Sequence, residues 1–310
     1  MKAQIELYSN LLRELEMDIG TRDLTELFLE ALALSIKNLK VNSPEAFLEQ
    51  FRGLYEVVSN TEPKFGILNY QFARLANYSQ DVVCKDKKCV KKWKHMVIKR
   101  LEQMIREERD KKVNIVKNAE KIEVDGKTIL IHDHSHTVQD ALVHYKNMGK
   151  KFKVIIAEQN FNKTHDNIER MHDAGIPFQV IPSYMLSHVH DQIDMVFFGA
   201  VTLKSTMNFV MSPGTHGIIS EFHVIDVPVY MFIDTAKFSL WKSKKKVGVF
   251  MHKHERTHYN KPITYERIKY SHDRVPHKLF KKIVTNEGVF TPVALKKLFD
   301  EKMKKYSFEK

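Results

Sequence analysis

The period of the apolar residues changes near residue 121, and this change constrains the possible folds more than any other feature of the chain. Before residue 121, apolar residues recur at steps of three and four, the period of an amphipathic helix. After it, short apolar runs alternate with stretches of helix length, as in a parallel sheet that helices cover on both faces. The sequence therefore predicts an α/β protein: an all-helical N-terminal domain, residues 1–121, followed by a Rossmann-like domain with a mainly parallel sheet, residues 122–310.

Three helical segments are predicted in the N-terminal domain. The first carries one apolar stripe, made of Leu24, Leu27, Phe28, Ala31, Leu32, Ile36 and Leu39. The second begins at residues 42–45, where the cap Ser43 precedes a proline in the first helical position. It continues through Phe47, Leu48, Phe51, Leu54 and Val58, and a turn follows at residues 60–64. The third carries Trp93, Val97, Leu101, Met104 and Ile105 and runs on to Val116.

Five apolar runs after residue 121 are predicted strands, at residues 128–132, 152–157, 178–181, 195–198 and 229–233. An amphipathic helix over 164–174, ended by Gly175 and Pro177, lies between two of them. Ligands of open parallel sheets bind beyond the carboxyl ends of the strands, so chemistry is sought in the residues after each run. No GxGxxG follows the first strand, and no P-loop, HExxH or GxSxG occurs, so no cofactor is predicted.

Composition bounds the class of protein. With 43% hydrophobic residues the chain can build a core, and no run approaches the length of a transmembrane helix. The first residues show no apolar signal-peptide core. The two cysteines, Cys84 and Cys89, are too few for a disulfide framework. A zinc knuckle is not predicted either, because it needs a second pair of ligands and the sequence offers none. A cytoplasmic protein without membrane contact is therefore expected.

The chain is basic, with 50 Lys and Arg residues against 38 acids and a formal charge of +12. The positive charge is concentrated at residues 85–100 and 242–246. Solvated side chains on a helix and a loop explain both runs. Contact with RNA or an acidic protein is the alternative, although no aromatic-rich strand of an RNA-recognition motif is present. His252, His254 and His258 follow the second run and are expected to be exposed on a basic loop.

The first predicted strand runs into six polar residues, His132-Asp133-His134-Ser135-His136-Thr137. If the strand continued, His132, His134 and His136 would share one face and could bind zinc or iron. The segment Ser135-His136-Thr137 also has the form of a helix N-terminus with a hydroxyl cap, and such ends bind phosphates and other anions. Plain capping and packing is the third interpretation, and the residues alone leave all three open.

Two further strand ends carry polar groups. The glycine-rich stretch Ser212–Gly217 contains Gly214 and Thr215 and can open a helix. Lys237 follows the fifth strand. An ammonium group facing backbone donors from two helix starts would complete a phosphate pocket. The alternative is that Lys237 is an ordinary surface lysine.

Several segments in order resemble the alpha, beta and delta subunit family of translation initiation factor two-B. They are Ile129–His132, Ala157-Glu158, Ala174–Pro177, Asp194–Ala200, Gly214-Thr215, Pro228–Tyr230, Ala236–Phe238 and Ile283–Pro292. Each is common alone, but their order and spacing over about residues 120–295 are specific. The superfamily also contains isomerases of ribose-1,5-bisphosphate and methylthioribose-1-phosphate, which interconvert an aldose and a ketose.

The resemblance implies that the isomerase chemistry is missing here. Where the isomerases have a cysteine this chain has Asp133, and where they have an aspartate it has Val201. Valine neither donates nor accepts a proton, so that role is lost. The arginine-glycine turn of the isomerases has only a scrambled match in Gly20-Thr21-Arg22-Asp23, and their arginine before a proline corresponds to Glu62. Met211-Ser212 replaces their asparagine-lysine pair.

The resemblance therefore implies a non-catalytic regulatory or scaffolding protein. It implies a homodimer, or a heterodimer with a related subunit, formed through the α/β domain, and a GTP-binding initiation factor as a partner. A vestigial pocket for a sugar phosphate or nucleotide would use Asp133, His134, Ser135, His136, Thr137, Gly214, Thr215 and Lys237. The alternative function is a sugar-phosphate isomerase with altered chemistry, in which Asp133 is the candidate catalytic base.

Overall fold

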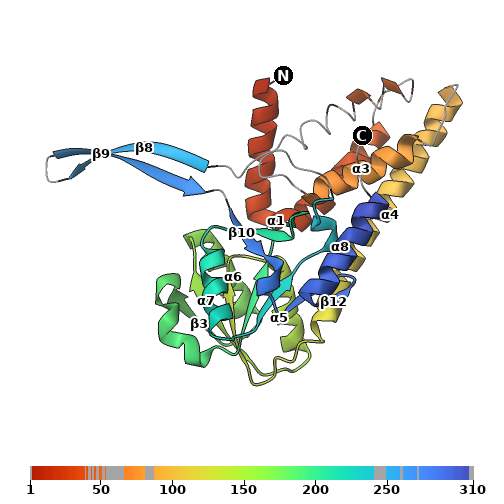
Figure 1. Cartoon of the computed structure of the whole chain (residues 1–310). Helices are drawn as coiled ribbons and strands as arrows, with labels where there is room; N and C mark the ends of the chain where they lie inside the picture. Colours follow the sequence, from red (N-terminus) through yellow and green to blue (C-terminus); the bar gives the residue numbers. More distant parts are fainter. Residues whose placement is uncertain are drawn as a thin grey trace.

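The N-terminal part of the protein is helical, as predicted. The structure, a computed structural model, describes residues 2–38, 40, 43, 45–46, 49–50, 53, 66–80, 87–240, 249–258, 261–270 and 272–306. Within them, α1 (Lys2–Asn38), α3 (Gly66–Gln80) and α4 (Lys87–Ala119) pack together (Figure 1). Their shared core includes Leu24, Phe72, Trp93, Val97 and Leu101, so most of the predicted apolar positions face inward. Leu27 and Ala31 of the first predicted stripe are instead exposed.

The boundaries of these helices refine the sequence prediction. The Ser43 cap is confirmed, since the Ala46 N–H donates to Ser43 Oγ at 3.2 Å. Phe47, Leu48, Phe51, Leu54, Val58 and the turn at 60–64 lie outside the described residues. The predicted run to Val116 is confirmed because α4 ends at Ala119. The division into domains 1–121 and 122–310 stays a prediction.

A mainly parallel sheet forms the centre of the second part. Its strands are β1 (Thr128–His132), β2 (Lys153–Glu158), β3 (Phe178–Pro182), β4 (Met195–Gly199), β7 (Val229–Phe232), β11 (Lys282–Thr285) and β12 (Gly288–Phe290). They lie in the order β12-β11-β7-β4-β1-β2-β3, and β12 is the antiparallel edge strand. All five predicted strands are confirmed. The chain builds outward from β1 to β3, then crosses to β4 on the other side of β1, so the strand order reverses between β1 and β4.

Helices cover both faces of this sheet. One apolar core contains residues of α5 (His136–Asn147), α6 (Phe161–Asp173) and the end of α4. The other contains residues of α7 (Thr215–Val224), α8 (Pro292–Tyr306) and the 3₁₀ segment η1 (Ser183–Gln192). A small sheet of β5 (Thr202–Leu203), β6 (Asn208–Met211) and β10 (Asp273–Pro276) packs on that side. This part of the chain also contains two shorter 3₁₀ turns, η2 (Thr235–Lys237) and η3 (His277–Leu279).

The region expected to be a basic loop is instead a β-hairpin. Strand β8 (Val249–His258) pairs with β9 (Lys261–Tyr270) in antiparallel register, and both extend away from the rest of the molecule (Figure 1). The loop expectation for His252, His254 and His258 is therefore wrong. The segment is rich in β-branched and aromatic residues, whose strand preference the dense charge obscured. Residues 242–246 and Cys84 lie outside the described residues.

Membrane insertion was examined by helix length and hydropathy. No helix in the described ranges is both long and apolar enough to cross a bilayer. α4, one of the longest at 33 residues, exposes Lys91, Lys92 and Lys99 between its buried apolar positions. That alternation is typical of a helix with one solvated face.

Candidate functional site

The predicted site residues gather where the strand order reverses, at the carboxyl ends of β1 and β4. In open α/β sheets this position creates a crevice, because the helices after the two strands leave in opposite directions. The loop after β1 carries Asp133–Ser135, and the loop after β4 carries Ala200 and Val201. The fold thus brings to one edge the residues that the sequence analysis singled out after these two strands.

Asp133 is held by a network that no sequence motif indicated. Its φ of +66° is in the left-handed region, which aspartate tolerates better than most residues. Asp133 Oδ1 accepts from Lys163 Nζ at 2.6 Å and from the His134 N–H at 2.8 Å. Lys163 also donates to Ser212 Oγ at 2.8 Å, and Asn167 Nδ2 donates to the Asp133 carbonyl at 3.0 Å. The Asp133 carboxylate is therefore paired with the ammonium group of Lys163.

Ser135 does not cap α5 with its hydroxyl, contrary to the prediction. It occupies the N-cap position with an extended backbone, but its side chain makes no capping hydrogen bond. The hydroxyl instead packs against Gly199, the last residue of β4. A Cβ at Gly199 would overlap Ser135 Oγ and would lie 2.6 Å from Ser135 Cβ. This close contact joins the loops after β1 and β4, and it explains why the hydroxyl is not available to the helix.

Lys237 lies at the same edge of the sheet. It ends η2, and its Nζ donates to the Ala200 carbonyl at 3.3 Å. The neighbouring Val201 is half-buried and brings no ionisable group to this position. Ser135, Gly199, Ala200 and Lys237 thus form one continuous set of contacts across β1, β4 and β7.

The start of α7 already meets an anion from its own chain. Gly214 takes the left-handed N-cap conformation with φ +93°, and Thr215 is fully buried. The backbone N–H of His216 donates to Asp273 Oδ2 at 2.9 Å, so β10 supplies a carboxylate to this helix end. A phosphate at Gly214 and Thr215 stays a prediction, and it would lie near that carboxylate.

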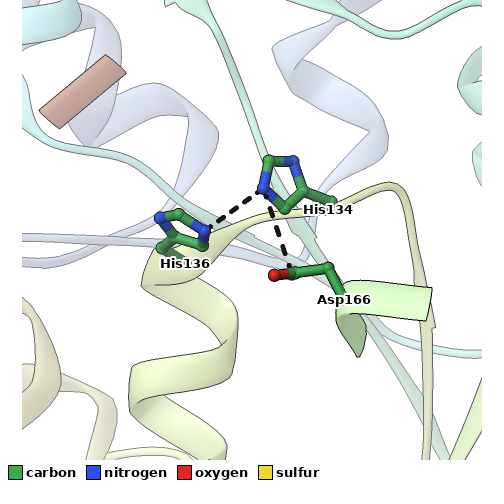
Figure 2. A group of neighbouring side chains, drawn as sticks. All are labelled: His134, His136 and Asp166. Atoms are coloured by element: carbon green, nitrogen blue, oxygen red, sulfur yellow. Dashed lines mark hydrogen bonds and ion pairs between the residues drawn. The ribbon is translucent and has the colours of Figure 1, made fainter. Parts of the chain in front are cut away.

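The three histidines of the β1 loop separate into two environments. His132 is buried, and its ring meets Phe198 edge-on. Burial lowers the pKa of His132, so its imidazole is neutral in the folded protein. His134 and His136 instead face each other beside Asp166 of α6, as Figure 2 shows. Burial, and then the neighbouring His134, lower the pKa of His136.

Helix α6 supplies side chains that sequence reasoning missed. Lys163, Asp166 and Asn167 lie on one helical face, which is turned toward the β1 loop. Their spacing of three and four residues was the available signal. The periodicity predicted the apolar face of this helix, and these three side chains lie on its polar face.

A second missed cluster lies between the helices and the sheet. Glu108 of α4 is 1% exposed, accepts from Gln71 Nε2 at 2.5 Å, and pairs with Lys111. The charge of buried Asp234, at the end of β7, acts on both Glu108 and Lys111. Burial raises the pKa of Glu108. The cluster attaches the helical part of the chain to the same sheet edge.

Comparison with known proteins agrees with this fold. A model of the initiation factor 2 subunit family matches residues 20–292. Translation initiation factor eIF2B subunit alpha of Dictyostelium discoideum is 29% identical over 147 residues, which cover 47% of this chain and 46% of that protein. The ribose 1,5-bisphosphate isomerase of Archaeoglobus fulgidus is 25% identical over 198 residues, 64% of this chain and 61% of that enzyme. The matched region is therefore less than two thirds of either relative.

A solved structure extends the likeness in fold to nearly the whole chain. In the tetrameric eIF2B-beta2-delta2 complex from C. thermophilum, one chain superposes with a TM-score of 0.70. The superposition covers 97% of this chain and 94% of that one at 17% identity. The resemblance noted from the strand-end residues is confirmed, and the match over residues 20–292 identifies this chain as a member of the initiation factor 2 subunit family.

Proposed function

We propose that this protein is a non-catalytic regulatory or scaffolding subunit of the translation initiation factor 2B type. The proposal rests on the residues at the two positions where the related isomerases have a cysteine and an aspartate. The cysteine position holds Asp133, which pairs with Lys163 at 2.6 Å, and the aspartate position holds Val201. A valine cannot pass a proton between sugar carbons, so the aldose–ketose reaction lacks one of its two groups.

The test of this proposal is an isomerase assay on the purified full chain. The substrates are ribose-1,5-bisphosphate and methylthioribose-1-phosphate, and no turnover above the buffer rate is expected. A matched variant, Val201→Asp, restores the missing carboxylate and shows whether the pocket still accepts the substrate. Turnover by the unaltered chain that disappears in Asp133→Asn would overturn the proposal.

The partners in this proposal are other subunits and a GTP-binding initiation factor, in the cytoplasm. Dimerisation, with a second copy or a related subunit, is assigned to the α/β part. Large apolar side chains are exposed there on η1 and at the end of α7. These two elements are neighbours, because His190 of η1 contacts Glu221 of α7 at 2.7 Å. These exposed side chains are Tyr184, Met185, Val224 and Ile225. Exposed apolar patches of this kind are typical of subunit contacts.

Two measurements test these partners. Sedimentation of the full chain is expected to give a dimer, either alone or with a related subunit, and Val224→Asp is expected to shift it to monomer. A pull-down from the source cell with mass spectrometry is expected to recover a GTP-binding initiation factor. A monomer in every mixture, or recovery of no translation protein, would contradict the assignment.

The second candidate function is an isomerase, or a sugar-phosphate binder, with altered chemistry. It is favoured by the 25% identity to a ribose 1,5-bisphosphate isomerase and by the Asp133–Lys163 pair, an acid and a base in contact. Lys237 would receive the phosphate. A thermal-shift assay with sugar phosphates and nucleotides distinguishes binding from no binding, since saturable stabilisation that Lys237→Ala abolishes supports a retained pocket. Turnover of ribose-1,5-bisphosphate then separates an isomerase from a binder.

Contact with RNA is a further possibility within the first function. Lys91, Lys92 and Lys99 are exposed along α4 and form part of the basic region 85–100. Reversal of these three charges to Glu is expected to weaken binding to ribosomal RNA and to reduce its dependence on salt. Equal RNA binding by the reversed variant would assign these lysines to ordinary solvation.

A further inference from the structure

Three side chains that no motif groups together meet beside the crevice, as Figure 2 shows. His134 Nε2 lies 3.2 Å from His136 Nε2 and 3.9 Å from Asp166 Oδ2. All three ligand atoms lie within 4.8 Å of one another. The two imidazoles come from the loop after β1 and the first turn of α5, while the carboxylate comes from α6.

These distances match the spacing of ligands around one small cation. Zinc binds imidazole nitrogen and carboxylate oxygen at about 2.0–2.1 Å in tetrahedral geometry, so two of its ligand atoms lie about 3.3 Å apart. The nitrogen pair is close to that separation. The Asp166 oxygen has to approach His134 Nε2 by about 0.6 Å, and it has to approach the His136 nitrogen by up to about 1.5 Å, because the three ligand atoms lie within 4.8 Å of one another. The side chain of Asp166 is 41% exposed, so it has room to move.

The next shell of residues is arranged as in zinc sites. The other nitrogen of His136, Nδ1, lies 3.9 Å from Asp23 Oδ2 of α1. Gln139 Nε2 donates to Asp166 Oδ2 at 2.5 Å. The hydrogen bond from Gln139 orients the Asp166 carboxylate, as in the outer contacts of metal sites. The 3.9 Å between His136 Nδ1 and Asp23 is longer than a hydrogen bond, so Asp23 contributes charge rather than orientation.

The local charge favours a cation over an anion. The carboxylates of Asp166, Asp23 and Asp140 all act on His136. Asp140 is already neutralised by Lys112 at 3.3 Å and Arg170 at 3.1 Å, whereas Asp23 and Asp166 both lie 3.9 Å from the histidine pair. A phosphate placed between the two imidazoles would face these carboxylates.

We propose that His134, His136 and Asp166 form a binding site for Zn²⁺ that no comparison with a relative indicates. Water occupies the fourth position of the tetrahedron, since the group provides three donors. The ion joins the β1 loop to α6 and holds the His136 ring, which Gly20 of α1 approaches closely. The proposed regulatory role does not require the ion. His134 and His136 are also residues of the phosphate pocket predicted from the sequence, so zinc and a phosphate would compete for them.

Zinc titration of the metal-free full chain tests the proposal. The protein is stripped with a chelator, dialysed into a buffer that does not bind metals, and titrated with ZnCl₂ by calorimetry. One equivalent is expected to bind in the unaltered chain and to be lost in His134→Ala. Asp166→Asn keeps the shape of the side chain but removes the charge of a ligand, and weaker binding is expected. Cobalt substitution adds a spectroscopic readout, since tetrahedral Co²⁺ gives visible bands that His134→Ala should lose and that Asp166→Asn should change.

The matched control is His165→Ala, which removes an exposed histidine one residue from Asp166. That histidine pairs with Glu169 at 3.3 Å, away from the cluster, and its loss should leave zinc binding unchanged. Thermal melts of the metal-free variants establish that each is folded, and Asp166→Asn decides the outcome if His134→Ala does not fold. Identical titrations of the unaltered chain, His134→Ala and Asp166→Asn overturn the proposal. Stabilisation by inorganic phosphate without any effect of zinc overturns it as well.

Discussion

Gly20 of α1 lies directly against the ring of His136, and a side chain at that position has no room. A Cβ built on Gly20 would lie 2.9 Å from His136 Nδ1. The glycine interrupts α1 with φ 76° and ψ 158°, a conformation that is essentially restricted to glycine. The kink thus places the N-terminal helix against the loop after β1, although 116 residues separate the two in sequence. Gly20 therefore marks a contact between the helical part and the candidate site.

Gly20→Ala is expected to lower the free energy of unfolding by about 1–3 kcal/mol, because backbone strain and the overlap with His136 act together. Denaturant unfolding measures the change. Gly217→Ala is the matched control: Gly217 lies inside α7, a Cβ there would meet nothing within 4 Å, and alanine should stabilise that helix by up to about 1 kcal/mol. A neutral Gly20→Ala would show that the kink and the contact do not constrain the fold.

Gly199→Ala is expected to destabilise the protein by about 1–3 kcal/mol, the usual cost of overpacking a tight contact. The clash is with Ser135, so Ser135→Gly in the same chain should recover most of the loss. A double-mutant cycle read by thermal unfolding gives the coupling between the two positions. Additive effects would mean that the two loops adjust independently.

Lys111→Met is expected to destabilise the protein by about 3–5 kcal/mol, since it leaves the buried Glu108 carboxylate without its cation. Adding Glu108→Gln removes the unpaired charge and should recover part of that loss. The control Lys112→Met removes a lysine whose side chain is 45% exposed and leaves Asp140 its pair with Arg170, so it should cost less than about 1 kcal/mol. Equal losses for Lys111→Met and Lys112→Met in denaturant unfolding would contradict the buried pair.

The stability of the protein is expected to fall as the pH is lowered below the ordinary histidine pKa of about 6.5. Burial lowers the pKa of His132, so between the two pKa values the unfolded chain binds a proton that the folded chain does not. The free energy of unfolding therefore rises with pH in this window, by at most about 1.4 kcal/mol per pH unit for one histidine.

Denaturant unfolding at several pH values from 5 to 7.5 measures this slope. His132→Asn should reduce it, while a residual slope remains because burial also lowers the pKa of His136 and of His277. If His132→Asn retains the full slope, the proton uptake belongs to other groups.

The sequence alone determined five parallel strands of the α/β part and the edge of the sheet where the candidate residues lie. Apolar runs such as Ile129–Ile131 have to be buried on both faces, and this requirement identifies a parallel strand without any knowledge of its neighbours. Charge is a weaker guide, because a charged strand and a charged loop have similar composition. For this reason the hairpin of β8 and β9 was expected to be a loop.

Only the tertiary structure decided which side chains meet. Lys163 reaches Asp133 from 30 residues away, and Asp166 replaces His132 beside the two other histidines. Ser135 has the residue type of a helix cap, but its contact with Gly199 turns the hydroxyl away from α5. Periodicity reports which face of an element is buried, whereas contacts between elements depend on strand order and on the space left by distant glycines. That is the physical reason why the partners of Asp133, Ser135 and His136 required the folded chain.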